Sequence, residues 1–317
     1  MDGIVKCWNL VVVGCIILAC KDPALSANFH VEVVKLPPLR IGKQQIRAHT
    51  QGLELVRGNI YVTARREDVN PRQALLLRTS LSAANWEVWN ITPVDADGAM
   101  LLDHPGGMQS DGKRLWIPIA ESKPKSRTMI RAFSMESIVP GVPLKAEFEF
   151  PFNDHIGALA VSMQDESTHP GTNQNLLLGA NWDTETVYIW SVDSQLIQRL
   201  TGGELSIRGL GIAGAEGGRT GIAVQDWKIT KQGLFASGLS KSTRANQNLA
   251  SSRLVILEDA LAPDFKRREI ILPRYNGVEL GREAMSVSDD NIYVLPEDLG
   301  ATNRLFRISK ADLLKSD

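Results

Sequence analysis

The chain has almost no cysteine and almost no net charge. Its three cysteines, Cys7, Cys15 and Cys20, all lie near the N-terminus, so disulfides and cysteine-ligated zinc are excluded from the rest of the chain. A net charge of −1 provides no field that would attract nucleic acid or an anionic membrane. The G-x-S-x-G and H-E-x-x-H motifs are also absent, which argues against a common serine hydrolase and against a zincin.

The first residues indicate export. Lys6 precedes the apolar run Leu10–Ala19, which suits a signal peptide and is too short to cross a membrane. Small residues up to Ala27 favour a signal peptide over residues 1–27, cleaved before Asn28, and a periplasmic or secreted protein with no transmembrane domain in the mature chain. The alternative is a lipid anchor on Cys20, which ends an imperfect lipobox.

A short motif returns five times along the chain. Each copy ends in a bulky apolar marker residue, and in four copies a strand-like run follows after a short turn. The markers are Leu53, Met108, Leu159, Trp227 and Met285. Each interval between markers is long enough for a four-stranded propeller blade of about 40–50 residues. The sequence therefore predicts an all-β protein, a five-bladed β-propeller formed as a single domain by residues 28–317.

Two details concern the ring itself. A six-bladed propeller is the alternative, if residues 196–212 form a blade remnant of their own. The alternating segment Phe29–Val33 is expected to add a strand to the blade that holds Tyr293. That pairing would close the ring and remove exposed sheet edges. Residues 309–315 predict a short terminal helix.

Three of the five histidines occupy one position of the repeat. His49, His104 and His155 each precede their marker by four residues, which places them together at one mouth of the central channel. Neutral imidazoles there could bind a divalent metal, with Glu283 completing the ligand set. Alternatively, one histidine could act as a general base. These four residues are the candidate catalytic group; in the remaining interpretation each histidine only ties its blade to the next.

A second column stands two residues before each marker. It consists of Gln51, Gly106, Gly157, Gln225 and Glu283. Together with the adjacent Asp226 and Trp227, the two glutamines are the candidate ligand-binding residues. Most of the tryptophans in or beside strands, which are Trp116, Trp182, Trp190 and Trp227, are expected in the core between blades, where an aromatic ring buries a large area.

Two stretches resemble known families. The segment His49–Glu54 resembles the first-blade T-Q-G-L motif of plant-type glutaminyl cyclases, which are exported five-bladed propellers with an acid–base glutamate in the second blade; the matching position here is Gly106. The stretch Asp103–Gly112, with Asp154–Ala158, resembles a family of exported proteins of unknown function along most of the chain. That resemblance implies a fold and a compartment but no activity.

Two classes of function remain open. The first is an exported hydrolase or lyase that acts at the histidine-lined mouth, with or without a divalent metal. A glutaminyl cyclase-like acyltransferase is another hypothesis within this enzyme class. The second class is a non-catalytic propeller that binds a ligand or a partner. In each case we expect a monomer that takes a small-molecule or peptide ligand and does not bind nucleic acid.

Overall fold

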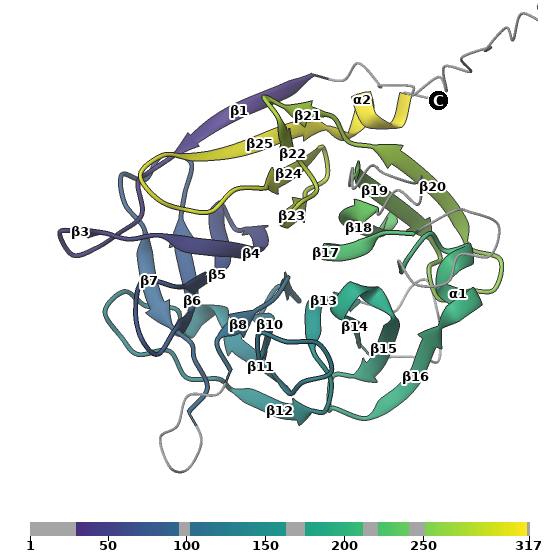
Figure 1. Ribbon diagram of the computed structural model, residues 1–317, viewed down its shortest axis with the longest axis horizontal. Coiled ribbons are helices and arrows are strands. Elements are labelled where there is room, and N and C mark those ends of the chain that lie inside the picture. Colours follow the sequence, from purple (N-terminus) through teal and green to yellow (C-terminus); the bar gives the residue numbers. More distant parts are fainter. Residues whose placement is uncertain (1–29, 95–101, 163–174, 212–220, 241–250, 316–317) are drawn as a thin grey trace, which may run out of the picture.

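Five antiparallel sheets surround a central axis (Figure 1). The computed structural model describes residues 30–94, 102–162, 175–211, 221–240 and 251–315. Four sheets have four strands each, and in the second blade the innermost strand is split into two short pieces. The predicted five-bladed propeller is confirmed. The predicted signal peptide, residues 1–27, and its cleavage site lie outside the described residues.

The first three blades follow one another along the chain. Blade 1 consists of β4 (Ala48–Val56), β5 (Asn59–Arg66), β6 (Gln73–Thr79) and β7 (Glu87–Asn90). Blade 2 consists of β8 (His104–Pro105), β9 (Gln109–Ser110), β10 (Arg114–Ala120), β11 (Thr128–Ser134) and β12 (Phe148–Phe152). Blade 3 consists of β13 (Ile156–Ser162), β14 (Leu176–Asn181), β15 (Thr186–Ser191) and β16 (Leu196–Thr201).

The last two blades complete the ring. Blade 4 consists of β17 (Ala223–Thr230), β18 (Gly233–Ser240), β19 (Ser251–Glu258) and β20 (Lys266–Ile271). Blade 5 consists of β23 (Ala284–Val287), β24 (Asn291–Leu295), β25 (Asn303–Ser309) and β1 (Val31–Leu36). In Figure 1 the inner strands β4, β8, β13, β17 and β23 face the centre.

Short elements decorate the blades. Two small hairpins consist of β2 (Arg40–Ile41) with β3 (Gln44–Gln45), and β21 (Arg274–Tyr275) with β22 (Val278–Glu279). The helical pieces are η1 (Met135–Ser137), η2 (Trp182–Thr184), α1 (Gly202–Ile207) and α2 (Lys310–Lys315), the last being the predicted terminal helix. Within the described residues, no helix has the length and apolar character needed to cross a membrane.

The ring closes between the two ends of the chain. β1 pairs antiparallel with β25, from Val31 opposite Ile308 to Leu36 opposite Asn303. β25 in turn pairs with β24, which holds Tyr293. The predicted closing strand is therefore confirmed. The six-bladed alternative is wrong, because residues 196–201 form the outer strand of blade 3 and residues 202–207 form α1.

The hydrophobic core is divided among the seams between blades. Five clusters of buried side chains each join two neighbouring blades, so every seam of the ring has its own core. The five marker residues of the repeat are all fully buried. Trp116 and Trp190 lie together in the seam between blades 2 and 3, as predicted. The repeated apolar marker is thus a packing requirement of the seams.

The second column of the repeat coincides with irregularities in the inner strands. The pairing register shifts between Thr50 and Gly52, between Ile156 and Ala158, and between Val224 and Asp226. The extra residue at each shift is Gln51, Gly157 or Gln225. A β-bulge bends its strand and redirects the side chains beside it. In blades 1, 3 and 4 this column therefore marks the point where the inner strand bends at the mouth of the channel.

Candidate functional site

The mouth of the channel is built from two sets of strand ends. Inner strands begin there, and the antiparallel second strand of each blade ends there. The first set supplies the predicted residues His49, His104, His155 and Glu283. The second set supplies Arg65, Ser122, Trp182 and Asp298, which follow or end β5, β10, β14 and β24. Opposite strand ends thus place eight side chains from four blades on one face.

His49 forms an ion pair at this mouth. Its Nδ1 lies 2.7 Å from Oδ1 of Asp298, so a protonated ring donates to the carboxylate. That bond raises the pKa of His49, and the nearby charge of Glu283 acts in the same direction. The same bond lowers the pKa of Asp298. His49 and Asp298 therefore form a charged pair between blades 1 and 5.

His104 has the opposite electrostatic environment. Its Nε2 lies 3.0 Å from Oε1 of Gln51, and its Nδ1 lies 3.0 Å from Nη1 of Arg65 and 3.1 Å from Oγ of Ser122. Because Arg65 can only donate, Nδ1 accepts and Nε2 carries the hydrogen. Burial lowers the pKa of His104 well below its usual value, with contributions from the charges of His155, Arg65 and His49. His104 is therefore a neutral imidazole.

His155 joins blade 3 to a loop of blade 2. Its Nδ1 donates to the carbonyl oxygens of Glu121, at 2.8 Å, and Lys123, at 3.1 Å. Burial lowers its pKa. Its ring centroid lies 5.2 Å from that of His104. The structure thus brings His104 and His155 together, and gives His155 the contacts that the inter-blade interpretation requires.

Glu283 is a buried carboxyl group at the start of β23. Arg282 lies beside it, with Nε 3.2 Å from Oε1. Burial raises its pKa to about 7, and the negative charge of Asp298 adds to the effect. The pKa of Asp298 is shifted in the other direction, because its bond to His49 lowers it. The pKa values of these two carboxyl groups at one mouth are therefore displaced in opposite directions.

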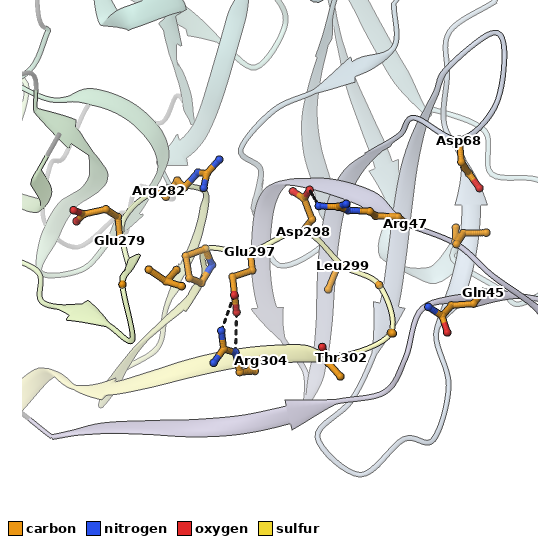
Figure 2. A pocket seen from close by; sticks show the side chains of 16 residues that line it. Gln45, Arg47, Asp68, Glu279, Arg282, Glu297, Asp298, Leu299, Thr302 and Arg304 are labelled. Carbon is orange, nitrogen blue, oxygen red and sulfur yellow. Dashed lines mark hydrogen bonds and ion pairs between the residues drawn. The ribbon is translucent and has the colours of Figure 1, made fainter. Parts of the chain in front are cut away.

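A charged cavity of about 820 Å³ opens beside Asp298 (Figure 2). It lies at the seam between blades 1 and 5, and Asp298 lines it. Arg47 and Arg282 also line it, and Arg304 donates to Glu297 in a two-bonded ion pair at 2.8 and 2.6 Å. Charged and hydrogen-bonding groups therefore dominate the wall, which suits a polar ligand rich in donors and acceptors.

No three-ligand cluster supports the metal interpretation within the described ranges. Among these residues, no group of three or more His, Cys, Asp or Glu side chains could hold a metal ion. Instead, each of the three histidines has a separate set of protein partners.

Two predicted ligand-binding residues lie in the interior. Asp226 is fully buried, and Oδ2 accepts the amide N–H groups of Leu53 and Met285, both at 3.0 Å. Its Oδ1 accepts Nζ of the buried Lys228 at 2.5 Å. Trp227 is fully buried in the seam between blades 3 and 4. Asp226 thus joins the inner strands of blades 1, 4 and 5 at the axis, while Gln225 stays half-buried at its bulge.

Further polar side chains fill the axis beyond Asp226. Glu54 accepts the amide N–H of Ser110 at 3.1 Å, and burial raises its pKa to about 7. Gln109 donates to the carbonyl of Ile229 and accepts the amide of Val161, which joins blades 2, 4 and 3. Glu54, Gln109 and Asp226 thus form a hydrogen-bonded layer that joins the inner strands of all five blades.

The position that carries the acid–base glutamate in the cyclases is sterically closed here. A Cβ atom on Gly106 would lie 2.3 Å from the carbonyl oxygen of Gly157. Any side chain at this position would require the backbone of blade 2 or blade 3 to move. The geometry therefore does not support the cyclase-like alternative.

This crowding predicts a difference between two glycines of the same column. Gly106→Ala should lower the free energy of unfolding by about 1–3 kcal/mol, because the added methyl group overpacks the contact between blades. Gly157→Ala is the matched control: its Cβ would have nothing closer than 3.8 Å. Urea unfolding of both variants measures the difference. Equal stability of the two would contradict the described contact.

Sequence reasoning missed the residues at the ends of the second strands. Asp298 and Trp182 lie in segments that differ in length and sequence from blade to blade, so they share no repeat position. Strand pairing could have located them, because the end of the antiparallel second strand lies beside the start of the inner strand in each blade. Most of the strand tryptophans were expected in the core, and Trp182 is the exception, because it is 37% exposed.

Solved structures share the fold at low sequence identity. The catalytic domain of a GH62 α-L-arabinofuranosidase from Coprinopsis cinerea has a TM-score of 0.53 and 8% identity, over 89% of this chain and 98% of that one. An α-L-arabinofuranosidase from Podospora anserina, solved with cellotriose, has a TM-score of 0.50 and 9% identity, over 87% and 95%. A bifunctional GH43-CE protein of Bacteroides eggerthii has a TM-score of 0.50 and 10% identity over 82% of this chain, which spans only 32% of that protein.

Sequence comparison identifies the family and no activity. No curated protein matches the chain. Residues 89–258, more than half of the chain, match DUF6454, a family of unknown function. This match includes the Asp103–Gly112 and Asp154–Ala158 stretches and confirms the resemblance to a family without an established activity. The chain belongs to the DUF6454 family of unknown function.

Proposed function

We propose that this propeller is a glycoside hydrolase whose reaction takes place at the mouth between blades 1 and 5. The observation that carries the proposal is the pair of carboxyl groups with displaced pKa values. Burial raises the pKa of Glu283 to about 7, whereas the bond to His49 lowers the pKa of Asp298. One neutral and one ionised carboxyl group in the same site is the arrangement that glycosidic bond cleavage uses.

The proposed roles follow from these protonation states. Asp298, oriented by His49, accepts a proton from water as the water oxygen bonds to the anomeric carbon. The bond from that carbon to the leaving oxygen breaks, and its electron pair stays on the oxygen. Glu283 gives its proton to this oxygen. Exchange with solvent then restores both groups, so the net reaction consumes one water molecule.

The surroundings support a polar substrate. The cavity beside Asp298 is lined by charged side chains, which can pair with hydroxyl groups. Gln51, positioned by the bulge in β4 and paired with His104, adds an amide at the same mouth. Two α-L-arabinofuranosidases share this fold, and their activity supports the choice of glycosides over other substrates.

Turnover of simple glycosides tests the proposal. The purified chain would be incubated with 4-nitrophenyl α-L-arabinofuranoside, β-D-xyloside and β-D-mannoside, and release of 4-nitrophenol would be measured. Hydrolysis of at least one glycoside above the rate in buffer is expected. If none is hydrolysed by the folded protein, the hydrolase proposal fails and the binding propeller is favoured.

The pH dependence of turnover provides a second prediction. Glu283 must be protonated to act as the acid, and its pKa is raised to about 7. Activity should therefore be retained below pH 7 and fall about tenfold per pH unit above it. The measurement is kcat between pH 5 and 9. Each reaction is quenched at the same alkaline pH before the released 4-nitrophenol is measured. A profile that falls instead between pH 4 and 5 would contradict the role of Glu283.

A further inference from the structure

One tryptophan differs from all the others that the structure describes. Trp86, Trp89, Trp116, Trp190 and Trp227 are each at most 7% exposed, whereas Trp182 is 37% exposed. Trp182 is also the only aromatic residue among the large hydrophobic side chains exposed in the described part of the chain. Its partly exposed indole therefore offers an apolar surface, which an aromatic ring with a polar N–H can present to a ligand.

The position of Trp182 is at the mouth. Its ring centroid lies 4.7 Å from that of His155, nearly perpendicular to it, and 6.4 Å from that of His104. His104 in turn contacts Gln51 and Arg65 from blade 1. An apolar ring and a group of hydrogen-bonding side chains therefore lie side by side on one surface.

The backbone that carries Trp182 is strained. The next two residues, Asp183 and Thr184, have φ values of 58° and 56°, and Thr184 is β-branched. Such a residue in this region costs about 1–3 kcal/mol and persists only where neighbouring structure imposes it. Here Oγ1 of the buried Thr184 accepts the amide of Val224 at 2.8 Å, and the Trp182 amide donates to the His155 carbonyl at 3.2 Å.

Blades 3 and 4 thus hold a strained turn in one conformation. Strain of this kind is concentrated at sites that bind ligands. The exposed ring and the strained turn are two separate observations, and both point to a ligand at the same place.

We propose that Trp182 is a substrate-binding platform on which a sugar ring stacks, with the hydroxyl edge of that ring directed to Gln51, Arg65 and His104. A pyranose or furanose has an apolar face of C–H groups and a polar rim, which matches this pairing of an indole with donors and acceptors. The inference rests on the proposed glycosidase function and adds the subsite that binds the carbohydrate. It places the bound sugar across the mouth, from blade 3 to blades 1 and 2.

Binding without turnover separates this inference from the reaction. Xylotriose and α-1,5-arabinotriose would be titrated calorimetrically into Glu283→Gln and into the double variants that add Trp182→Ala or Trp182→Phe. We expect Trp182→Ala to raise the Kd of at least one trisaccharide about tenfold and Trp182→Phe to restore most of the affinity. Ile207→Ala, which shortens another exposed apolar side chain, is the control and should leave Kd unchanged.

Each outcome has a separate meaning. If neither trisaccharide binds, or if Trp182→Ala binds as tightly as its parent, the platform is overturned. If turnover is seen in the chain with Glu283 intact while Kd is independent of Trp182, the hydrolase stands and the platform fails. If Trp182-dependent binding is measured but no glycoside is cleaved, the platform stands and the hydrolase fails. With Glu283 intact, Trp182→Ala should raise KM and leave kcat nearly unchanged, since stacking acts in the ground and transition states alike.

Discussion

Replacing Asp226 with alanine is expected to lower the free energy of unfolding by about 3–5 kcal/mol. The substitution leaves the buried Lys228 ammonium without its carboxylate and leaves the amides of Leu53 and Met285 without an acceptor. Removing one member of a buried ion pair is costly because the remaining charge stays desolvated. Denaturant unfolding followed by tryptophan fluorescence measures the loss.

Two further variants make the test specific. Asp289→Ala removes an exposed carboxyl in a turn and should change the free energy of unfolding by no more than about 0.5 kcal/mol. Asp226→Asn keeps one oxygen acceptor but removes the charge. It should therefore lower the free energy of unfolding by less than Asp226→Ala and by more than Asp289→Ala. If Asp226→Ala is as stable as the Asp289 control, the axis does not depend on this carboxylate.

Replacing Glu283 with glutamine is expected to reduce kcat by about 10²–10⁴-fold on the glycoside that the native chain hydrolyses. Glutamine has nearly the same shape but has no ionisable proton to give to the leaving oxygen. The loss should appear mainly in kcat, because substrate contacts elsewhere at the mouth remain. The fall in activity above pH 7 should disappear from whatever turnover is left.

Glu54→Gln is the matched control for this experiment. Glu54 is another buried glutamate whose pKa is raised to about 7, but it lies in the axial layer and bonds to Ser110. Glu54→Gln should leave kcat unchanged, and activity should still decline above pH 7. If Glu54→Gln abolishes that decline and Glu283→Gln does not, the acid has been assigned to the wrong carboxyl group.

The five-bladed ring could be predicted from the sequence because its packing repeats. Every seam needs a bulky side chain at the same point of the inner strand, so Leu53 and Met285 share one motif although they lie at opposite ends of the chain. The mouth was predicted in part for the same reason: His49 and His104 share a repeat position. The closing strand was predictable because its residues alternate between apolar and polar, and because the last blade lacked a fourth strand.

The rest of the site depends on features that have no repeat. Asp226 and Trp227 lie next to the bulge at Gln225, and the extra residue there decides which side chain faces the axis and which faces the seam. That choice cannot be read from strand alternation alone. Asp298 belongs to a loop of irregular length, and its function emerges only once the antiparallel pairing places it beside His49.

The pairing of β1 with β25 has a consequence for how the site is assembled. During synthesis β1 leaves the ribosome first, and its partner emerges only when nearly all of the chain has been made. Four blades can therefore form while the fifth lacks its outer strand. Blade 5 carries Glu283 and Asp298, so the blade that holds the carboxyl pair receives its fourth strand only when the ring closes. Loss of β1, by proteolysis for example, would remove the outer strand of the blade that carries the candidate site and leave β25 as an exposed sheet edge.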